Sequence, residues 1–446
     1  MKLSNCAGSG AGLFGFWSGG LVGNMNQDEV FIGMRQLWGQ EKLFGLSPAE
    51  RRHHTYIIGK TGSGKTSLLR NMILQDIAVG RGVGVLDPHG DLAEDLLDHI
   101  PSWRTDHVVY FNPADLTHPI GLNLLAHVKP DQQPLVASGV VSAFKNIWGD
   151  SWGPRLEYIL YASVASLCQC QNVTLLGLQR ILADDQFRQW VVNQLVDPVL
   201  RRFWTHEFAG YDKRFLAEVI SPIQNKVGQL LMAPSIRNVL GQVRSRIDFR
   251  FMMDHRRVFI ANLSKGRLGE DKASLLGSLL VTQFQLATMS RAEVSAEDRQ
   301  DFQLYVDEFA NFCTDSFSSI LSEARKYRLC LTLSHQYLEQ VPPGIRSAVL
   351  GNIGTIVCFR ISESDAQVIA REIGGGYSAS LISGQRNFEI CVRTMHNDGG
   401  SNPFSASTLS PLFLGYGCGK NIVSRSRQKY GTPRRKVENK INRWMG

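Results

Sequence analysis

The segment Gly59-Lys-Thr-Gly-Ser-Gly-Lys-Thr66 constrains this chain more than any other feature of its 446 residues. It satisfies the P-loop pattern G-x-x-x-x-G-K-[ST], with a β-prone run at 55–59 before it and a helical pattern at 67–76 after it. Glycines let backbone N–H groups converge on phosphate oxygens, and the helix N-terminus adds its dipole. The residues predicted to bind the nucleotide are Gly59, Lys60, Thr61, Gly62, Ser63, Gly64, Lys65, Thr66 and Ser67.

Two residues of this loop have specific predicted roles. Lys65 is expected to reach the β- and γ-phosphates, and the Thr66 hydroxyl is expected to ligate Mg²⁺. The predicted cofactors are therefore ATP and Mg²⁺. The alternative is a chance glycine turn, and the strand and helix patterns on its two sides argue against it.

A second motif is the apolar strand at 302–306 that ends in Asp307 and Glu308. It resembles a Walker B motif, in which the first acid supports the Mg²⁺ shell and the second polarises the attacking water. Asp307 is therefore a predicted metal residue and Glu308 the predicted general base. The adjacent glutamate favours the additional-strand, glutamate-catalysed NTPases over small GTPases or kinases. Strands often end in acids, so the prediction depends on the P-loop as well.

Three further polar residues are candidates for sensing or stabilising the γ-phosphate. Gln336 ends the apolar strand at 329–335 and can bond both phosphate and water through its amide. The alternative for Gln336 is a capping or turn residue. Arg325 is a candidate arginine finger that acts on a neighbouring subunit, or else part of a solvated basic helix face. Arg360, at the end of another predicted strand, is its rival.

The turn after the strand at 82–86 leaves two interpretations open. Asp87 and His89 could position water or metal in the ligand crevice, or the turn could simply end a strand with a helix cap at Asp91. His53 and His54 lack metal-ligand spacing and are expected to be unpaired surface residues.

The order of strand and helix patterns predicts an α/β fold with a mostly parallel sheet, because β-α-β rhythm requires parallel strands. From residue 131 to 242 the pattern is helical, with a break expected at Pro222. The expected organisation is a glycine-rich N-terminal segment (1–50), a nucleotide-binding domain in two parts (51–130 and 243–414), an inserted all-α domain (131–242) and a basic tail (415–446).

The positive charge is concentrated at the C-terminus. Residues 420–446 hold nine basic residues and one acid, which accounts for the whole formal excess of +8. We expect a mobile extension that suits nucleic acid, acidic protein or anionic lipid equally, or that only solubilises the chain. The most apolar stretch, residues 7–23, contains seven glycines and is too short for a transmembrane helix. A cytoplasmic protein is expected, recruited to the inner face of the membrane through a partner or weakly through the tail.

Taken together, the motifs over about residues 50–410 resemble the type IV coupling protein (TraD/TraG) branch of the FtsK–HerA superfamily. The residues that carry the resemblance are His54–Thr66, Val85–Asp91, Tyr305–Phe309, Glu323–Lys326 and Ser334–Gln336. The resemblance implies a RecA-like P-loop ATPase that forms a ring, with a hexamer expected, and pumps DNA in conjugation or type IV secretion. Gln336 then matches the family's sensor and Arg325 its arginine finger. The absence of a transmembrane helix departs from membrane-anchored members of the family.

The resemblance implies DNA, a secretion channel and relaxosome proteins as partners. Two alternatives remain open. One is a HerA-like translocase that processes DNA together with a nuclease. The other is a protein-secretion ATPase that does not act on DNA.

Overall fold

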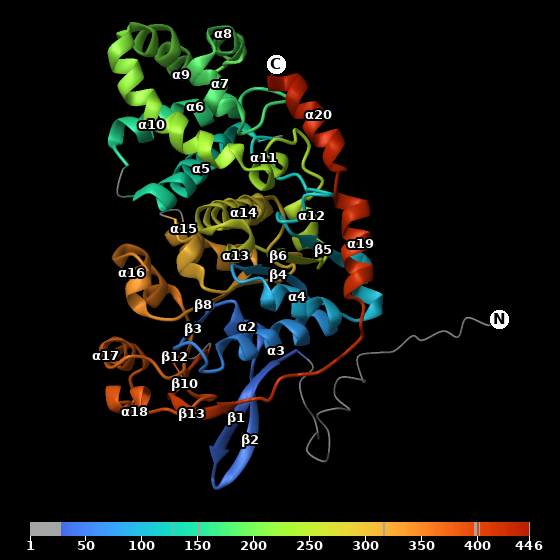
Figure 1. Cartoon of the computed structure of the whole chain (residues 1–446). Helices are drawn as coiled ribbons and strands as arrows, with labels where there is room; N and C mark the ends of the chain where they lie inside the picture. Colours follow the sequence, from blue (N-terminus) through green and yellow to red (C-terminus); the bar gives the residue numbers. More distant parts are fainter. Residues whose placement is uncertain are drawn as a thin grey trace, which may run out of the picture.

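The computed structural model describes residues 28–126, 128–149, 152–314, 317–396, 399–400 and 402–445. Its centre is an eleven-stranded sheet in the order β2-β1-β13-β10-β9-β3-β8-β7-β4-β6-β5 (Figure 1). The strands are β1 (Val30–Leu37), β2 (Gln40–Leu46), β3 (Thr55–Ile58), β4 (Gly82–Asp87), β5 (Val108–Phe111), β6 (Val258–Asn262), β7 (Phe302–Val306), β8 (Leu329–His335), β9 (Thr355–Cys358), β10 (Glu389–Arg393) and β13 (Phe404–Thr408). A separate pair joins β11 (Met395–His396) to β12 (Gly399–Gly400).

The seven strands from β9 to β5 in this order are parallel. Their side chains are buried throughout, which is why they read as continuous apolar runs in the sequence. Strand β8 lies between β3, which leads into the P-loop, and β7, which ends in the two acids. The predicted α/β fold with a mostly parallel sheet is confirmed, and β8 is the additional strand that Glu308 led us to expect.

Helices cover both faces of the parallel strands. One face is covered by α3, α4 and α19, and the other by α12 and α14 (Figure 1). The helices outside the segment 131–242 are α2 (Pro48–Arg51), α3 (Lys65–Ala78), α4 (Asp91–Asp98), α12 (Phe249–Asp254), α13 (Lys265–Leu268), α14 (Glu270–Ser290), α15 (Phe317–Glu323), α16 (Pro343–Asn352), α17 (Glu363–Ile373), α18 (Ala379–Ser383), α19 (Gly419–Tyr430) and α20 (Arg434–Met445).

Every regular element that the structure describes between residues 131 and 242 is helical. These elements are α5 (Gln133–Trp148), α6 (Pro154–Cys168), α7 (Gly177–Ala183), α8 (Asp185–Gln194), α9 (Pro198–Arg202), a π-helical turn (Phe203–Phe208), α10 (Lys213–Met232) and α11 (Pro234–Leu240). The break expected at Pro222 is wrong, because α10 continues through it. Helix α5 packs on α14 so closely that a Cβ atom on Gly139 would lie 2.4 Å from Thr282 Cγ2. The helical segment therefore shares its apolar core with one face of the sheet.

Four antiparallel strands extend the sheet beyond β9, and the sequence did not reveal them. Strands β1 and β2 form a hairpin, and β1 pairs with β13 in a register that sets Gly33 opposite Thr408. A Cβ atom on Gly33 would lie 2.2 Å from the Ser407 carbonyl oxygen, so glycine is required where the two backbones approach. These strands are half exposed and mixed in polarity, and the β1–β13 pair joins segments that lie hundreds of residues apart. The first 27 residues of the predicted glycine-rich segment lie outside the described residues.

The expected mobile extension at the C-terminus is wrong. Helix α19 packs on β5 and α4, and α20 packs on α11, so the two helices lie along one side of the molecule (Figure 1). Ile422, Val437 and Ile441 are buried, because an apolar residue recurs on the inner side of each otherwise basic helix. Among the described residues, we find no helix with both the length and the apolar character that crossing a bilayer requires.

Candidate nucleotide site

The P-loop connects β3 to α3 at the carboxyl edge of the parallel strands. Gly62 and Gly64 have φ angles of 77° and 117°, in the left-handed region that favours glycine. A Cβ atom on Gly59 would lie 2.5 Å from Phe359 Cβ, and one on Gly64 would lie 2.8 Å from Phe388 Cδ1. The loop can therefore take this shape only with glycine at these positions, and within the described residues the backbone N–H groups of Thr61, Gly62 and Gly64 have no hydrogen-bond acceptor.

Lys65 lies buried under this loop. Its Nζ donates to the carbonyl oxygens of Gly59, at 2.5 Å, and Lys60, at 3.3 Å. Burial lowers the pKa of Lys65, while the nearby carboxylates of Glu308 and Asp307 oppose that shift. The buried Ser63 Oγ has no hydrogen-bond partner within the described part of the chain. An ammonium group held on loop carbonyls, a hydroxyl without a partner and the N–H groups of Thr61, Gly62 and Gly64 together fit the phosphates of a nucleotide.

The two acids that end β7 lie beside this lysine. Asp307 Oδ1 accepts a hydrogen bond from Ser334 Oγ at 2.5 Å and one from the Glu308 backbone N–H at 3.1 Å. Glu308 has a φ angle of 44°, a rare backbone conformation for a residue with a side chain. Burial raises the pKa of Glu308, and a side-chain hydrogen bond with Gln336 lowers it. A carboxylate in a dry, strained position is typical of a general base.

Gln336 links the acid to the P-loop. Its Oε1 accepts a hydrogen bond from Thr61 Oγ1 at 2.9 Å, and its side chain also bonds Glu308. The preceding residue, His335, is buried against Tyr56, whose hydroxyl contacts His335 Nε2. Burial lowers the pKa of His335 to about 3, so its ring is neutral and acts as a spacer behind Gln336.

Sequence reasoning missed the role of Ser334. It is one of two hydroxyl residues in the otherwise apolar strand β8, and its Oγ donates to Asp307. A polar residue on a fully buried strand normally requires a partner, and that was the signal that could have found it. Ser334 fixes the orientation of the Asp307 carboxylate through its bond to Oδ1.

Of the two interpretations left open for Asp87, the structure supports the turn that ends a strand. Its two carboxylate oxygens accept backbone N–H groups of His89, at 2.8 Å, and Ala93, at 2.9 Å. Burial raises the pKa of Asp87, and these backbone bonds oppose the shift. The cap predicted at Asp91 is wrong, because the helix begins after Gly90 and Asp87 supplies the side-chain oxygens.

The two candidate arginines lie at opposite edges of the sheet. Arg360 follows β9, and its carbonyl oxygen accepts a hydrogen bond from Lys60 N at 2.9 Å, so it borders its own P-loop. Arg325 is exposed in the turn η7 (Ala324–Tyr327) before β8, and its Nη1 lies 2.9 Å from His53 Nδ1. The seven residues of β8 separate Arg325 from Gln336 by about 20 Å. Arg325 therefore does not reach the phosphate site of its own chain.

The prediction of two unpaired surface histidines is wrong for both: His53 is half-buried and its Nδ1 lies 2.9 Å from Arg325 Nη1, and the larger departure is His54. It is buried, its Nδ1 accepts a hydrogen bond from the Leu331 backbone N–H at 3.1 Å, and its Nε2 lies 3.2 Å from the Leu321 carbonyl oxygen. Burial lowers the pKa of His54 to about 4, which keeps it neutral. His54 therefore holds the start of β3 against β8, while His53 remains beside Arg325.

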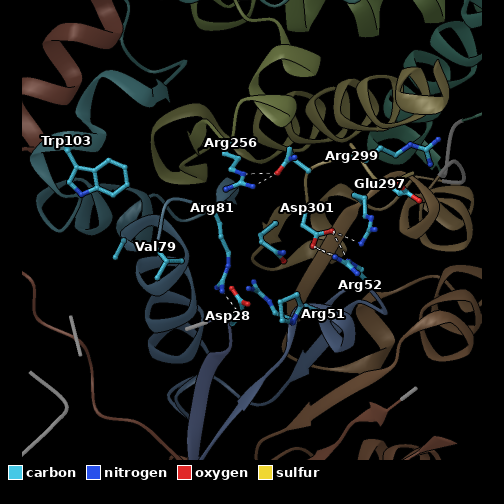
Figure 2. A pocket seen from close by; sticks show the side chains of 15 residues that line it. Asp28, Arg51, Arg52, Val79, Arg81, Trp103, Arg256, Glu297, Arg299 and Asp301 are labelled. Atoms are coloured by element: carbon cyan, nitrogen blue, oxygen red, sulfur yellow. Dashed lines mark hydrogen bonds and ion pairs between the residues drawn. The ribbon is translucent and has the colours of Figure 1, made fainter. Parts of the chain in front are cut away.

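A cavity of about 660 Å³ opens where the parallel strands begin, at the end of the sheet that we call the amino edge (Figure 2). Arginines and acids line most of it, including the pair Arg52–Asp301, whose side chains meet at 2.8 Å. Arg299 donates to the Lys326 carbonyl oxygen at 2.6 Å, and its guanidinium carbon lies 5.1 Å from the centre of the Tyr327 ring. Arg299, in the wall of the cavity, thus supports the turn that carries Arg325.

Known proteins resemble this chain in sequence. Residues 43–205 match the model of the type IV secretion-system coupling protein DNA-binding domain. Over 495 aligned residues, 95% of this chain is 21% identical to the type 4 coupling protein DotL of Legionella pneumophila. By these two matches, this chain is similar to the type IV coupling proteins. The resemblance predicted from the motifs is confirmed, and the chain spans 62% of the length of DotL.

Solved structures share the fold of this chain. The plasmid coupling protein TrwB in complex with ADP and Mg²⁺ matches 90% of this chain and 99% of its own, with a TM-score of 0.65 and 14% identity. VirB4 of Thermoanaerobacter pseudethanolicus matches 87% of this chain and 98% of its own, with a TM-score of 0.54 and 12% identity. At these identities the matches show a shared RecA-like fold with a helical part.

Proposed function

We propose that this chain is an ATP-driven coupling ATPase that forms a ring and moves DNA in conjugation or type IV secretion. One observation carries the proposal. Lys65, Glu308 and Gln336 meet at the carboxyl edge, where Lys65 and Gln336 each bond the P-loop, while Arg325 lies exposed at the opposite edge. Such a chain carries both halves of a nucleotide site. The halves join when the amino edge of one copy, with Arg325, stacks on the carboxyl edge of the next copy, with its P-loop.

The roles of the residues follow from their positions. The loop from Gly59 to Ser67 binds the phosphates, and Thr66 with Asp307 would hold Mg²⁺, which neutralises phosphate charge when it is bound. The Glu308 carboxylate takes a proton from the attacking water. Gln336 bonds Glu308 on one side and Thr61 on the other, so it reports the state of the γ-phosphate to the loop. Arg325 of the neighbouring copy stabilises the charge that develops on the transferred group.

The relatives support this assignment. TrwB was solved with ADP and Mg²⁺, and DotL is a type 4 coupling protein. We extend from them the cofactors ATP and Mg²⁺, DNA as the cargo, a hexameric ring, and a secretion channel with relaxosome proteins at the inner face of the membrane. We also propose that residues 51–130 and 243–414 act as one nucleotide-binding domain, with 131–242 as the inserted domain that receives cargo.

A second candidate function is a protein-secretion ATPase. The fold match to VirB4 favours it, although the TM-score is lower than that to TrwB. A translocase that works with a nuclease in DNA processing is the same kind of enzyme with another partner.

Steady-state ATPase assays with and without single- and double-stranded DNA test the proposal. We expect hydrolysis that DNA stimulates, that salt weakens and that Glu308→Gln slows by about 100-fold or more. The Glu41→Gln variant is the matched control, because Glu41 is exposed on β2, the outermost strand of the sheet. Hydrolysis that is active but indifferent to DNA would favour the protein-secretion ATPase. ATP hydrolysis at the wild-type rate in Glu308→Gln would overturn the assignment of the base.

A further inference from the structure

The outer side of helix α20 carries cations that the ATP site does not use. Arg435, Lys436, Lys440 and Arg443 are exposed, and none has a carboxylate partner among the residues that the structure describes. At 3.6 residues per turn they fall within a sector of about 140°. The helix turns its apolar residues the other way, so these four cations form a uniform charged face.

This face is held in place and not carried on a loose tail. Val437 and Ile441 are buried, and the Trp444 ring lies 5.7 Å from the Phe187 ring and 4.9 Å from the Arg180 guanidinium carbon. Glu438, the one acid of α20, is bonded to Arg434 at 2.8 Å and to the Asn238 amide at 3.3 Å. Because α20 is already ordered, a ligand that binds its outer face pays little conformational entropy for ordering the helix.

The basic surface continues past the start of α20. Arg246 Nη1 donates to the carbonyl oxygens of Lys429, at 3.3 Å, and Gly431, at 3.4 Å, so Arg246 sits at the junction of α19 and α20. We define the basic strip as Arg244, Arg246, Lys429, Arg435, Lys436, Lys440 and Arg443, all of which are exposed or half-buried.

Two arginines of α19 differ from the cations of the strip, because each forms an ion pair with an acid. Arg427 Nε bonds Asp115 at 2.6 Å, and Arg425 bonds Asp106. These ion pairs attach α19 to the segment around β5. The acids of this region are thus used to dock the helices, and the charge of the basic strip stays uncompensated.

The chemistry of the strip distinguishes among the ligands that a basic helix can bind. A helix that inserts into a membrane surface needs an exposed apolar face, and here the apolar face of α20 is covered by the protein. A protein interface needs an apolar or aromatic anchor at its centre and is depleted in lysine. A row of cations alone suits the phosphate backbone of nucleic acid, which is read without sequence preference.

We propose that the basic strip binds the phosphate backbone of DNA, as a contact separate from the ATP site. The proposal rests on the proposed function, in which DNA is the cargo. Helix α20 packs on α11, so the strip lies beside the inserted helical segment (Figure 1). DNA bound there would be held at the side of the segment that we propose receives cargo.

The test is DNA binding by the full chain, measured by fluorescence anisotropy with single- and double-stranded oligonucleotides from about 50 to 200 mM salt. The test variant is Arg435→Gln, Lys436→Gln, Lys440→Gln and Arg443→Gln together. We expect weaker binding and a flatter dependence on salt. For double strands, the log–log slope should fall by up to about 0.9 for each phosphate that the variant no longer neutralises. The corresponding value for single strands is about 0.7.

Two controls make the result specific. Lys42→Gln with Arg371→Gln removes the same charge as Lys436→Gln with Lys440→Gln, but from exposed positions outside the strip and outside residues 131–242, and should leave the slope unchanged. Lys436→Arg with Lys440→Arg keeps the charge of the strip and should bind as the wild type does. ATPase activity without DNA should be the same in all of these variants, which also shows that they fold.

The outcomes separate the strip from the function on which it rests. A wild-type protein that binds neither oligonucleotide overturns the proposed function. A wild-type protein that binds DNA with the same affinity and slope as the four-glutamine variant overturns the role of the strip and leaves the proposed function intact. Vesicles with and without anionic phospholipid form a further arm. If the variant loses only vesicle binding, the strip is a membrane contact and the proposal is wrong.

Discussion

The two edges of the parallel sheet differ in how complete they are. At the carboxyl edge, the side chains of Lys65, Glu308 and Gln336 are bonded to one another or to the P-loop, and the two charged groups are buried. At the amino edge, Arg325 extends into solvent and bonds only His53 among the described residues.

The difference shows how one sheet can supply both halves of a catalytic site. Charged groups that work within a chain are brought together by adjacent strands and are desolvated on folding. A group that works on another copy stays solvated until the copies meet. The comparison is therefore testable, because each edge can be disabled separately.

The largest expected effect is at the amino edge. Replacement of Arg325 by alanine should lower kcat by about a thousandfold or more, because a missing arginine finger leaves transition-state charge unbalanced. Nucleotide affinity should be nearly unchanged, which isothermal titration measures. Arg360→Ala is the matched control, and a loss of hydrolysis confined to that variant would move the finger to the carboxyl edge.

Mixed rings sharpen the same comparison. Lys65→Ala damages the carboxyl edge and Arg325→Ala the amino edge, so each is expected to be inactive alone. When the two variants are mixed in one ring, some interfaces pair an intact P-loop with an intact Arg325. Hydrolysis should then return in part. Mixtures that stay as inactive as the separate variants would show that the two residues do not meet across an interface.

Glu308→Gln should reduce kcat by about 100- to 10,000-fold, the usual contribution of a general base. The amide keeps the shape of the side chain, so ATP binding should persist and the nucleotide should remain uncleaved on the protein. Single-turnover hydrolysis with labelled ATP measures this. Normal turnover in Glu308→Gln would exclude the carboxylate as the base.

A smaller effect is expected on the pH dependence of hydrolysis. Glu308 acts as a carboxylate, so activity falls as pH drops through its pKa, and burial sets that pKa above the ordinary value for glutamate. The hydrogen bond with Gln336 lowers the pKa, so Gln336→Leu should move the acid limb of the kcat profile to higher pH. An acid limb that stays in place would mean that Gln336 does not bond the ionised form.

The smallest effect is expected at Arg299, which supports the turn that carries Arg325. Arg299→Gln should lower kcat by about tenfold or less, because the turn of Arg325 loses its bond to the Lys326 carbonyl oxygen. In an Arg325→Ala background the same change should have almost no further effect, a non-additivity that a purely structural role would not give. Arg256→Gln is the control in the same cavity, because Arg256 bonds Gln300 and does not contact the turn.

The sequence predicted most of the carboxyl edge, because its motifs are local. The glycines, Lys65 and Thr66 act within one loop, and Asp307 and Glu308 directly follow an apolar strand. The bond from Ser334 to Asp307 was beyond sequence reasoning, because it depends on which strand lies beside β7. The pairing of β1 with β13 was missed for the same reason, since it joins strands that lie hundreds of residues apart.

The sequence by itself determined the α/β class, the phosphate-binding loop, the acids and the concentration of positive charge at the C-terminus. Each of these follows from neighbours along the chain. The tertiary structure decided that Arg325 and Arg360 lie at opposite edges, that His54 is buried, and that the tail is two docked helices. The physical reason is that a strand separates its two ends by many ångströms, and that Val437 and Ile441 become apolar anchors only where α11 offers a surface to cover them.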